Sequence, residues 1–181
     1  MIKAVLRAKE LSFETKAGLF SREHVDTGSK LLIESLEIKP DDTILDIGCG
    51  YGPIGLAAAY AAPQGKVFMV DVDIRAIKMS KKNAITNQIH NVFILPSDGF
   101  EDVPADVPLN LVVSNPPSHT PKETVLQFIS DAHRQLVKGG RLYFVTERRI
   151  KSMIQREFEK IFGNYSIAAS DSEFVVSLAI K

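Results

Sequence analysis

Short apolar runs alternate with segments of helical periodicity along most of the chain, and this alternation constrains the fold more than any other feature. The apolar runs are residues 43–48 (TILDIG), 66–71 (KVFMVD), 91–98 (NVFILPSD), 109–117 (LNLVVSNPP) and 141–147 (RLYFVTE). The segments between and around them with helical spacing are 27–38, 53–62, 74–87, 122–137 and 149–162. Buried strands that alternate with helices form right-handed crossovers in a parallel sheet.

Two further strands are predicted at the end of the chain, at 164–169 and 173–180. Almost no residues separate them, so they can be joined only by a short hairpin and one of them must run antiparallel to the rest. We therefore predict an α/β fold with a doubly wound, mostly parallel sheet and an antiparallel last strand. The length of 181 residues is close to that of one domain.

Composition narrows the function classes. The 22 Lys and Arg residues are balanced by 22 Asp and Glu residues. This balance disfavours a strongly cationic, autonomous nucleic-acid binder, although a local basic face remains possible. The single cysteine, Cys49, excludes an intrachain disulfide and fits a reducing cytosol. The four histidines lie far apart, so no metal site is expected. The longest aliphatic run is too short to span a membrane, and we expect a cytoplasmic protein.

A glycine-rich segment, DIGCGYGPIG from Asp46 to Gly55, leaves the first predicted strand and enters a helix. Glycines there permit a tight turn and close approach of a ligand, next to the free N–H groups at the helix start. Gly50, Gly52 and Gly55, with Asp71 further on, satisfy the GxGxxG pattern of dinucleotide sites. The pattern is weak on its own, because a plain strand–helix turn can produce it.

Three acidic residues stand at the ends of predicted strands. Asp46 would repel a pyrophosphate but suits a cationic ligand. Asp71 is placed to accept hydrogen bonds from two ribose hydroxyls, while Asp73 fits the role of a helix cap better. Asp98, after Ser97, can accept from an exocyclic adenine amine, although a simple turn residue is an equal alternative.

The segment SNPPSH, from Ser114 to His119, follows the fourth predicted strand. Two consecutive prolines fix the backbone and remove two donors, which leaves carbonyl groups and the Asn115 side chain as acceptors for a planar NH₂ group. This segment and the glycine loop belong at the carboxyl ends of strands that flank the point where open α/β sheets bind ligands. An ordinary Asn-Pro turn is the alternative.

These segments together resemble the class I S-adenosylmethionine methyltransferases. The stretch 17–36 (AGLFSREHVDTGSKLLIESL), with 115–123 (NPPSHTPKE), resembles more narrowly the methyltransferase small domain family. That family includes RsmC-like enzymes that methylate the exocyclic amine of guanine in small-subunit ribosomal RNA. The resemblance covers roughly residues 11–180. It implies a Rossmann-like seven-stranded sheet in one domain over 1–181, with a segment 1–26 that covers the cofactor and substrate site and a core at 27–181.

The resemblance also implies the site. S-adenosylmethionine is the expected cofactor, with contacts from Asp46, Gly48, Gly50, Gly52, Asp71, Val72, Ser97, Asp98 and Asn115. Catalysis is assigned to Asn115, Pro116 and Pro117. Many members carry an aromatic residue where this chain has Ser118, and Phe20 is a candidate replacement for stacking on the target base. Substrate contacts are assigned to Phe20, Ser118 and His119. Independently of the resemblance, Arg148 and Arg149 belong to a local basic cluster after the fifth predicted strand and are assigned to phosphates beside the target base.

The predicted activity is methylation of a planar exocyclic amine, with guanine in small-subunit ribosomal RNA as the first candidate. A protein glutamine amide is an alternative substrate. A nicotinamide-dependent oxidoreductase and a non-catalytic binding module are the alternatives from other classes. Bacterial ribosomal enzymes of this type carry a second, non-catalytic copy of the domain, which this sequence does not show. Ribosomal RNA or a ribosomal particle is therefore the expected partner, and the oligomeric state is open.

Overall fold

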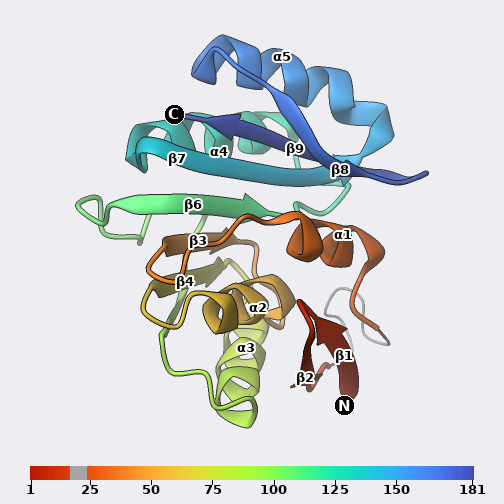
Figure 1. Ribbon diagram of the computed structural model, residues 1–181, viewed down its shortest axis with the longest axis vertical. Helices are drawn as coiled ribbons and strands as arrows, with labels where there is room; N and C mark the ends of the chain where they lie inside the picture. Colours follow the sequence, from red (N-terminus) through yellow and green to blue (C-terminus); the bar gives the residue numbers. More distant parts are fainter. Residues whose placement is uncertain (17–23) are drawn as a thin grey trace.

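A seven-stranded sheet runs through the centre of the molecule, with helices on both faces (Figure 1). The computed structural model describes residues 1–16 and 24–181. The strand order is β5-β4-β3-β6-β7-β9-β8. The strands are β3 (Thr43–Ile47), β4 (Lys66–Asp71), β5 (Val92–Pro96), β6 (Leu109–Ser114), β7 (Leu136–Glu147), β8 (Ser166–Ser170) and β9 (Phe174–Ile180).

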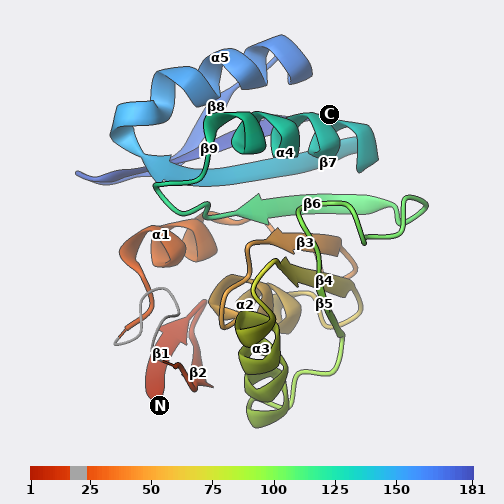
Figure 2. The ribbon, with the colours of Figure 1, turned by 180° about the vertical axis from the view of Figure 1, so that it is seen from behind.

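The core is divided into two halves because successive strand residues point to opposite faces of the sheet. In β3, Ile44 packs in the half that contains α1 (Thr27–Ser35), α2 (Pro53–Ala61) and α3 (Ile74–Thr86). Its neighbour Leu45 packs in the half that contains α4 (Lys122–Gln135) and α5 (Lys151–Phe162). Figure 1 shows α1 and α2 in front of the sheet, and Figure 2, from behind, shows α4 in front of β7.

The winding of the sheet reverses between β3 and β6. From β3 the chain builds outward through β4 to β5, and from β6 it builds in the other direction to β7. β3 and β6 lie parallel, with Ile47 opposite Ser114 at their carboxyl ends. Because a crevice opens where the winding reverses, the segments that follow these two strands are held on either side of it.

The last strand inserts between its two predecessors. β9 pairs with β7 on one side and with β8 on the other, antiparallel to both. The predicted α/β fold, mostly parallel with an antiparallel last strand, is confirmed.

β7 begins five residues before the predicted start, and α4 ends before residue 137. Gly139 and Gly140 follow the predicted helix, where glycines typically end one, but they lie inside β7. The Gly139 nitrogen donates to Lys181 O over 2.6 Å, and the Lys181 nitrogen donates to Gly140 O over 2.9 Å. The two glycines therefore extend the pairing with the end of the chain, at the cost of an irregularity in the ladder between β6 and β7.

A β-hairpin, β1 (Ile2–Leu6) and β2 (Lys9–Phe13), precedes the main sheet. Its two-residue turn, Arg7 and Ala8, has positive φ at both positions without a glycine. Asn83 of α3 and Asn87, the C-cap residue of that helix, each exchange two hydrogen bonds with the backbone of Glu14 and Ser12, respectively. The hairpin is thereby fastened against α3, which the sequence did not predict.

No helix in residues 1–16 and 24–181 is both long enough and apolar enough to cross a bilayer.

Candidate active site

A cavity of about 490 Å³ opens at the carboxyl ends of the parallel strands, within the size range of small-molecule sites. Its walls come from the glycine loop after β3, the ends of β4 and β5, the segment after β6, and the first residues of α1 and α4. The predicted site residues on these walls are Gly48, Gly50, Asp71, Val72, Ser97, Asp98, Asn115, Pro116, Pro117 and His119.

The glycine loop leaves open space on its cavity side. Gly48 and Gly50 have φ of +72° and +57°, and a Cβ on either would meet no atom within 4 Å. The peptide backbone is thus exposed to whatever occupies the cavity. Gly52 lies beneath the loop as the N-cap residue of α2 and does not line the cavity; a Cβ there would approach Met69 Cε to 2.9 Å.

Asp46 is fully buried below the loop and is not part of the cavity wall. Its Oδ2 accepts a hydrogen bond from the Gly55 nitrogen over 2.8 Å, whereas its Oδ1 has no partner. Burial raises the pKa of Asp46 to about 7; the bond from Gly55 opposes this rise, and the charge of Asp71 adds to it. The acid therefore lies behind the loop, without the exposed position that the predicted direct contact with a cationic ligand requires.

Asp71 ties two loops together. Its Oδ2 accepts from the Gly50 nitrogen over 2.9 Å and its Oδ1 from the Asp73 nitrogen over 2.8 Å. Asp73 caps α3 as predicted, through the Arg75 nitrogen, and Val72 between the two acids is 68% exposed against the cavity. The acid therefore supports the glycine loop as well as facing the ligand space.

Asp98 and Ser97 occupy the turn after β5. The Ser97 hydroxyl donates to Gly99 O and accepts from the Asp102 nitrogen, so it holds the turn. The exposed Asp98 lines the cavity beside it. Phe128 of α4 lies so close that a Cβ on Gly99 would come within 2.4 Å of its ring. An aromatic wall thus adjoins the acid, and sequence reasoning did not select it.

Asn115 is anchored by its own amide. Its Nδ2 donates to Asp26 Oδ2 and to Ser29 Oγ, both over 2.9 Å. Asp26 is also the N-cap of α1, because its side chain accepts from the Ser29 nitrogen. Within the described residues nothing donates to Asn115 Oδ1. The side chain keeps an acceptor for a donor in the cavity.

The two prolines after Asn115 differ in what their carbonyls do. Pro117 O accepts from the Thr120 nitrogen over 2.9 Å and closes a turn. Among the residues that the structure describes, no donor is bonded to Pro116 O. Pro117 O therefore already has one partner and Pro116 O has none, and a ligand-binding role for either carbonyl stays a prediction.

The remaining predicted substrate residues are dispersed. His119 lines the cavity, and Phe20 lies outside the described residues. Arg148 and Arg149 line a separate hollow of about 360 Å³ with Glu147, Glu173 and Phe174. Arg149 is nevertheless close to the segment after β6, with Nη2 at 3.5 Å from Ser118 O.

The described part of segment 1–26 contributes only Asp26 to the cavity wall, since residues 1–16 lie against α3 and α2. Cys49, although on the wall, is buried, and burial raises the pKa of its thiol well above the ordinary value. Over the described ranges, no group of three His, Cys, Asp or Glu side chains is placed to hold a metal.

Known proteins resemble this chain in both sequence and architecture. The sequence model of the family described as "Methyltransferase small domain" matches residues 10–177. An uncharacterized protein of Bacillus subtilis, YbxB, is 35% identical over 97% of this chain and 89% of its own length. Ribosomal RNA large subunit methyltransferase G of Colwellia psychrerythraea is 32% identical over 97% of this chain, but over 46% of its own length.

A solved structure of a ribosomal RNA methyltransferase is also similar to this chain. The 16S rRNA guanine N2 methyltransferase RsmC of T. thermophilus, in complex with AdoMet and guanosine, superposes with a TM-score of 0.90 at 26% identity. The match covers 99% of this chain and 50% of RsmC, so the chain spans about half the length of the ribosomal RNA methyltransferases it matches. The resemblance to S-adenosylmethionine-dependent methyltransferases is confirmed, and it decides against the nicotinamide-dependent oxidoreductase. The chain belongs to the methyltransferase small domain family.

Proposed function

We propose that the protein transfers a methyl group from S-adenosylmethionine to the exocyclic amine of a guanine in ribosomal RNA. Asn115 carries this proposal. Both hydrogens of its amide are bound, and its Oδ1 is left as an acceptor on the wall of the cavity. A planar NH₂ group is a donor that such an acceptor can bind.

The cavity fits S-adenosylmethionine in three respects. Gly48 and Gly50 leave space along the backbone where any side chain would intrude. The buried Asp46 has a partnerless Oδ1, and a bound cation would favour the charged form of this acid and so lower its pKa from the value of about 7 in the free protein. Asp71 and Asp98 offer carboxylate acceptors at the ends of β4 and β5 for hydroxyl and amine donors. When bound, this cofactor supplies a methyl group activated by its sulfonium centre.

One side-chain and one main-chain acceptor of this protein would then orient the nucleophile. Asn115 Oδ1 and Pro116 O accept the two hydrogens of the target amine and so aim the nitrogen lone pair along a fixed direction. Correct positioning of two reactants is worth up to about 7–11 kcal/mol of the barrier. No covalent intermediate with the protein is required.

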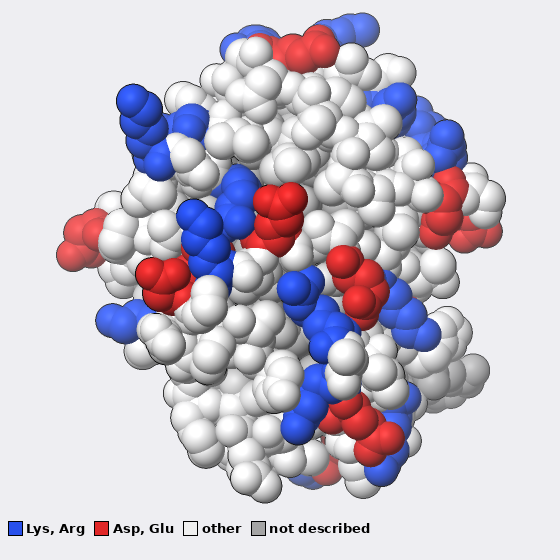
Figure 3. Space-filling model, in the orientation of Figure 1, with Lys and Arg blue, Asp and Glu red and all other residues white. Residues whose placement is uncertain are grey.

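The names of the relatives include both large-subunit and small-subunit enzymes, which supports ribosomal RNA as the substrate class and leaves the subunit open. On the face shown in Figure 3, Lys and Arg are interspersed with Asp and Glu. The described residues therefore form no broad basic surface for RNA binding on that face. We infer that a folded ribosomal particle, in the cytoplasm, presents the guanine. Arg149, which reaches Ser118 O, is placed for a nearby phosphate.

The test offers S-adenosylmethionine with a labelled methyl group to the protein, together with ribosomal particles from cells that lack the modification. Naked ribosomal RNA and ribosomal protein serve as parallel substrates, and the Asn115→Ala variant serves as the inactive control. The proposal expects label in guanosine of particle RNA, with weaker transfer to naked RNA. Label in a glutamine of ribosomal protein would replace it with the alternative substrate, and absence of transfer to all three would refute it.

A further inference from the structure

We propose that Asp26 and Ser29 are positioning residues that fix which end of the Asn115 amide faces the target amine. The proposal rests on the proposed function for its catalytic meaning, but the arrangement itself is a property of the free protein. Asp26 and Asn115 are separated by 89 residues along the chain, and their contact joins the start of α1 to the segment after β6.

The polarity of the Asn115 amide follows from its partners. A carboxylate only accepts hydrogen bonds, so the Asn115 atom that lies 2.9 Å from Asp26 Oδ2 must be the NH₂ nitrogen. Ser29 Oγ, also at 2.9 Å, takes the second hydrogen. With both hydrogens engaged, Oδ1 is the atom left for the cavity. The negative charge of Asp26 also polarises the amide and strengthens Oδ1 as an acceptor.

Packing holds Asp26 in this position. Its Oδ2 also accepts from the Ser29 nitrogen over 2.9 Å, so one carboxylate oxygen serves both α1 and Asn115. Gly28 is confined behind it, because a Cβ there would lie 3.1 Å from Asp26 Oδ2 and 3.0 Å from the Phe174 ring. Ser29 is only 4% exposed. The carboxylate therefore has little room to turn away from Asn115.

Loss of the anchor would free the Asn115 amide to rotate by half a turn. The rotated amide presents NH₂, a donor, to a substrate amine that is also a donor, and no productive hydrogen bond forms. Asp26 and Ser29 thus select the productive orientation before substrate arrives, which is the condition for preorganised catalysis.

Ser29→Ala gives the sharpest test, because it removes one acceptor and keeps Asp26 as the cap of α1. Ser35→Ala is the matched control: its hydroxyl bonds Leu32 O in the same helix, away from the cavity. We expect Ser29→Ala to lower kcat about tenfold, with KM for the particle and affinity for S-adenosylmethionine within about twofold of the starting protein. Ser35→Ala should leave kcat unchanged. An unchanged kcat in Ser29→Ala would contradict the proposal.

A double-mutant cycle separates positioning from capping. Asp26→Ala should lower both the melting temperature and kcat in the starting protein. In the Asn115→Ala background, Asp26→Ala should still lower the melting temperature, but kcat should stay at the value of Asn115→Ala alone. Asp26→Asn keeps an acceptor oxygen and should retain part of the activity. Additive losses in kcat would show that Asp26 acts only through stability.

The side-chain NH₂ signals of Asn115 in the ¹⁵N–¹H NMR spectrum provide a reading that needs no substrate. They should shift and exchange faster with water in Ser29→Ala, and stay in place in Ser35→Ala. If the starting protein methylates no RNA, the proposed function is wrong, yet these signals still decide whether the anchor exists. Unchanged Asn115 signals in Ser29→Ala would overturn the inference.

Discussion

The backbone nitrogen of Gly50 donates a hydrogen bond to Asp71 Oδ2 over 2.9 Å, which ties the glycine loop after β3 to the end of β4. The other oxygen of Asp71 accepts from the Asp73 nitrogen. Each carboxylate oxygen has a second lone pair. One side chain can therefore hold the loop and accept ligand hydroxyls at the same time.

Asp71→Ala should weaken binding of S-adenosylmethionine by tenfold or more. Each hydrogen bond to a charged acceptor contributes about 1.5–3 kcal/mol, and the loop also loses its anchor. Titration calorimetry with S-adenosylmethionine and its demethylated product measures the effect. Asp41→Ala, in the exposed turn before β3, is the control and should bind normally. Unaltered affinity in Asp71→Ala, or tight binding of NADH, would contradict this account of the cavity.

Asn115→Ala should separate catalysis from cofactor binding. Turnover should fall by roughly 10²–10³, the scale for one preorganised polar group, while affinity for S-adenosylmethionine changes little. Asn164→Ala is the matched control, since that amide also donates both hydrogens, to Phe162 O and Ile180 O, far from the cavity. It should lower stability and leave turnover intact. Near-normal methyl transfer by Asn115→Ala would show that the NPP segment is only a turn and has no catalytic role.

Asp46 should make the free energy of unfolding depend on pH. The pKa of Asp46 is raised from 3.8 to about 7 in the folded protein, so between these values the folded state holds a proton that the unfolded state releases. Stability therefore falls as pH rises through this window, by a total on the order of 4 kcal/mol.

Urea unfolding at several pH values, compared with Asp46→Asn, isolates this contribution. Asp46→Asn removes the titration, so its stability relative to the starting protein should increase from about pH 4 to about pH 7 and then level off. A difference between the two proteins that stays constant with pH would rule out the raised pKa.

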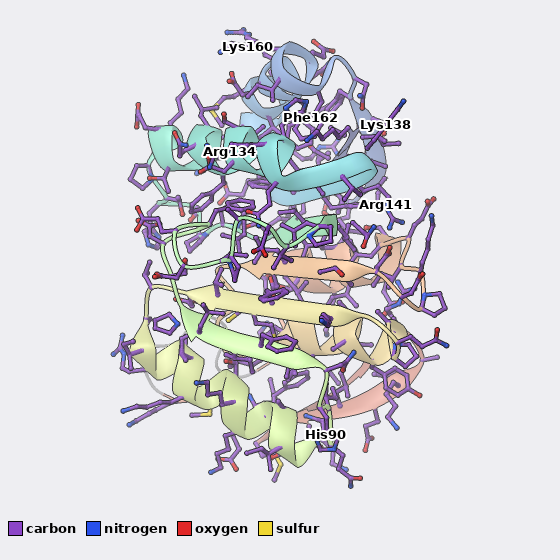
Figure 4. The ribbon with its side chains drawn as sticks, turned by 90° about the vertical axis from the view of Figure 1, so that its left-hand side faces the viewer. His90, Arg134, Lys138, Arg141, Lys160 and Phe162 are labelled. Atoms are coloured by element: carbon purple, nitrogen blue, oxygen red, sulfur yellow. The ribbon has the colours of Figure 1, made fainter. Side chains whose placement is uncertain are left out.

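Charge reversal of Arg148 and Arg149 should raise KM for the ribosomal particle more than it lowers kcat, as expected for lost ground-state binding. Methyl transfer by the starting protein should also decline as salt is added. Each phosphate contact contributes about −0.7 to −0.9 to the slope of the logarithm of the binding constant against the logarithm of the salt concentration. Reversal of Lys138 and Lys160 is the control, because both lie on the side where the parallel strands begin (Figure 4). Equal effects of the two pairs would indicate non-specific attraction.

The order of helices and strands in the core was predictable because burial imposes a strong periodic signal on it. The N-terminal hairpin was not, because its strands are only five residues long, few of their residues are fully buried, and its turn at Arg7 and Ala8 lacks a glycine. The start of β7 was missed since Gly139 and Gly140 read as a helix stop, whereas distant pairing with Lys181 decides their structure.

The residues of the site also divide into those that were predictable from the sequence and those that were not. Asp71, Asp98 and Asn115 were predictable because strand ends in such a sheet converge on one crevice. The link from Asn115 to Asp26 depends on how α1 docks, and no local pattern encodes it. Asp26 could have been suspected only as a capping residue before TGS.

The most direct test of the proposed activity is mass spectrometry of ribosomal RNA nucleosides from cells with and without the gene, and from cells that carry only the Asn115→Ala form. The account predicts that one methylated guanosine is lost on deletion, returns with the intact gene and does not return with Asn115→Ala. Identical nucleoside profiles in all of these cells would contradict it.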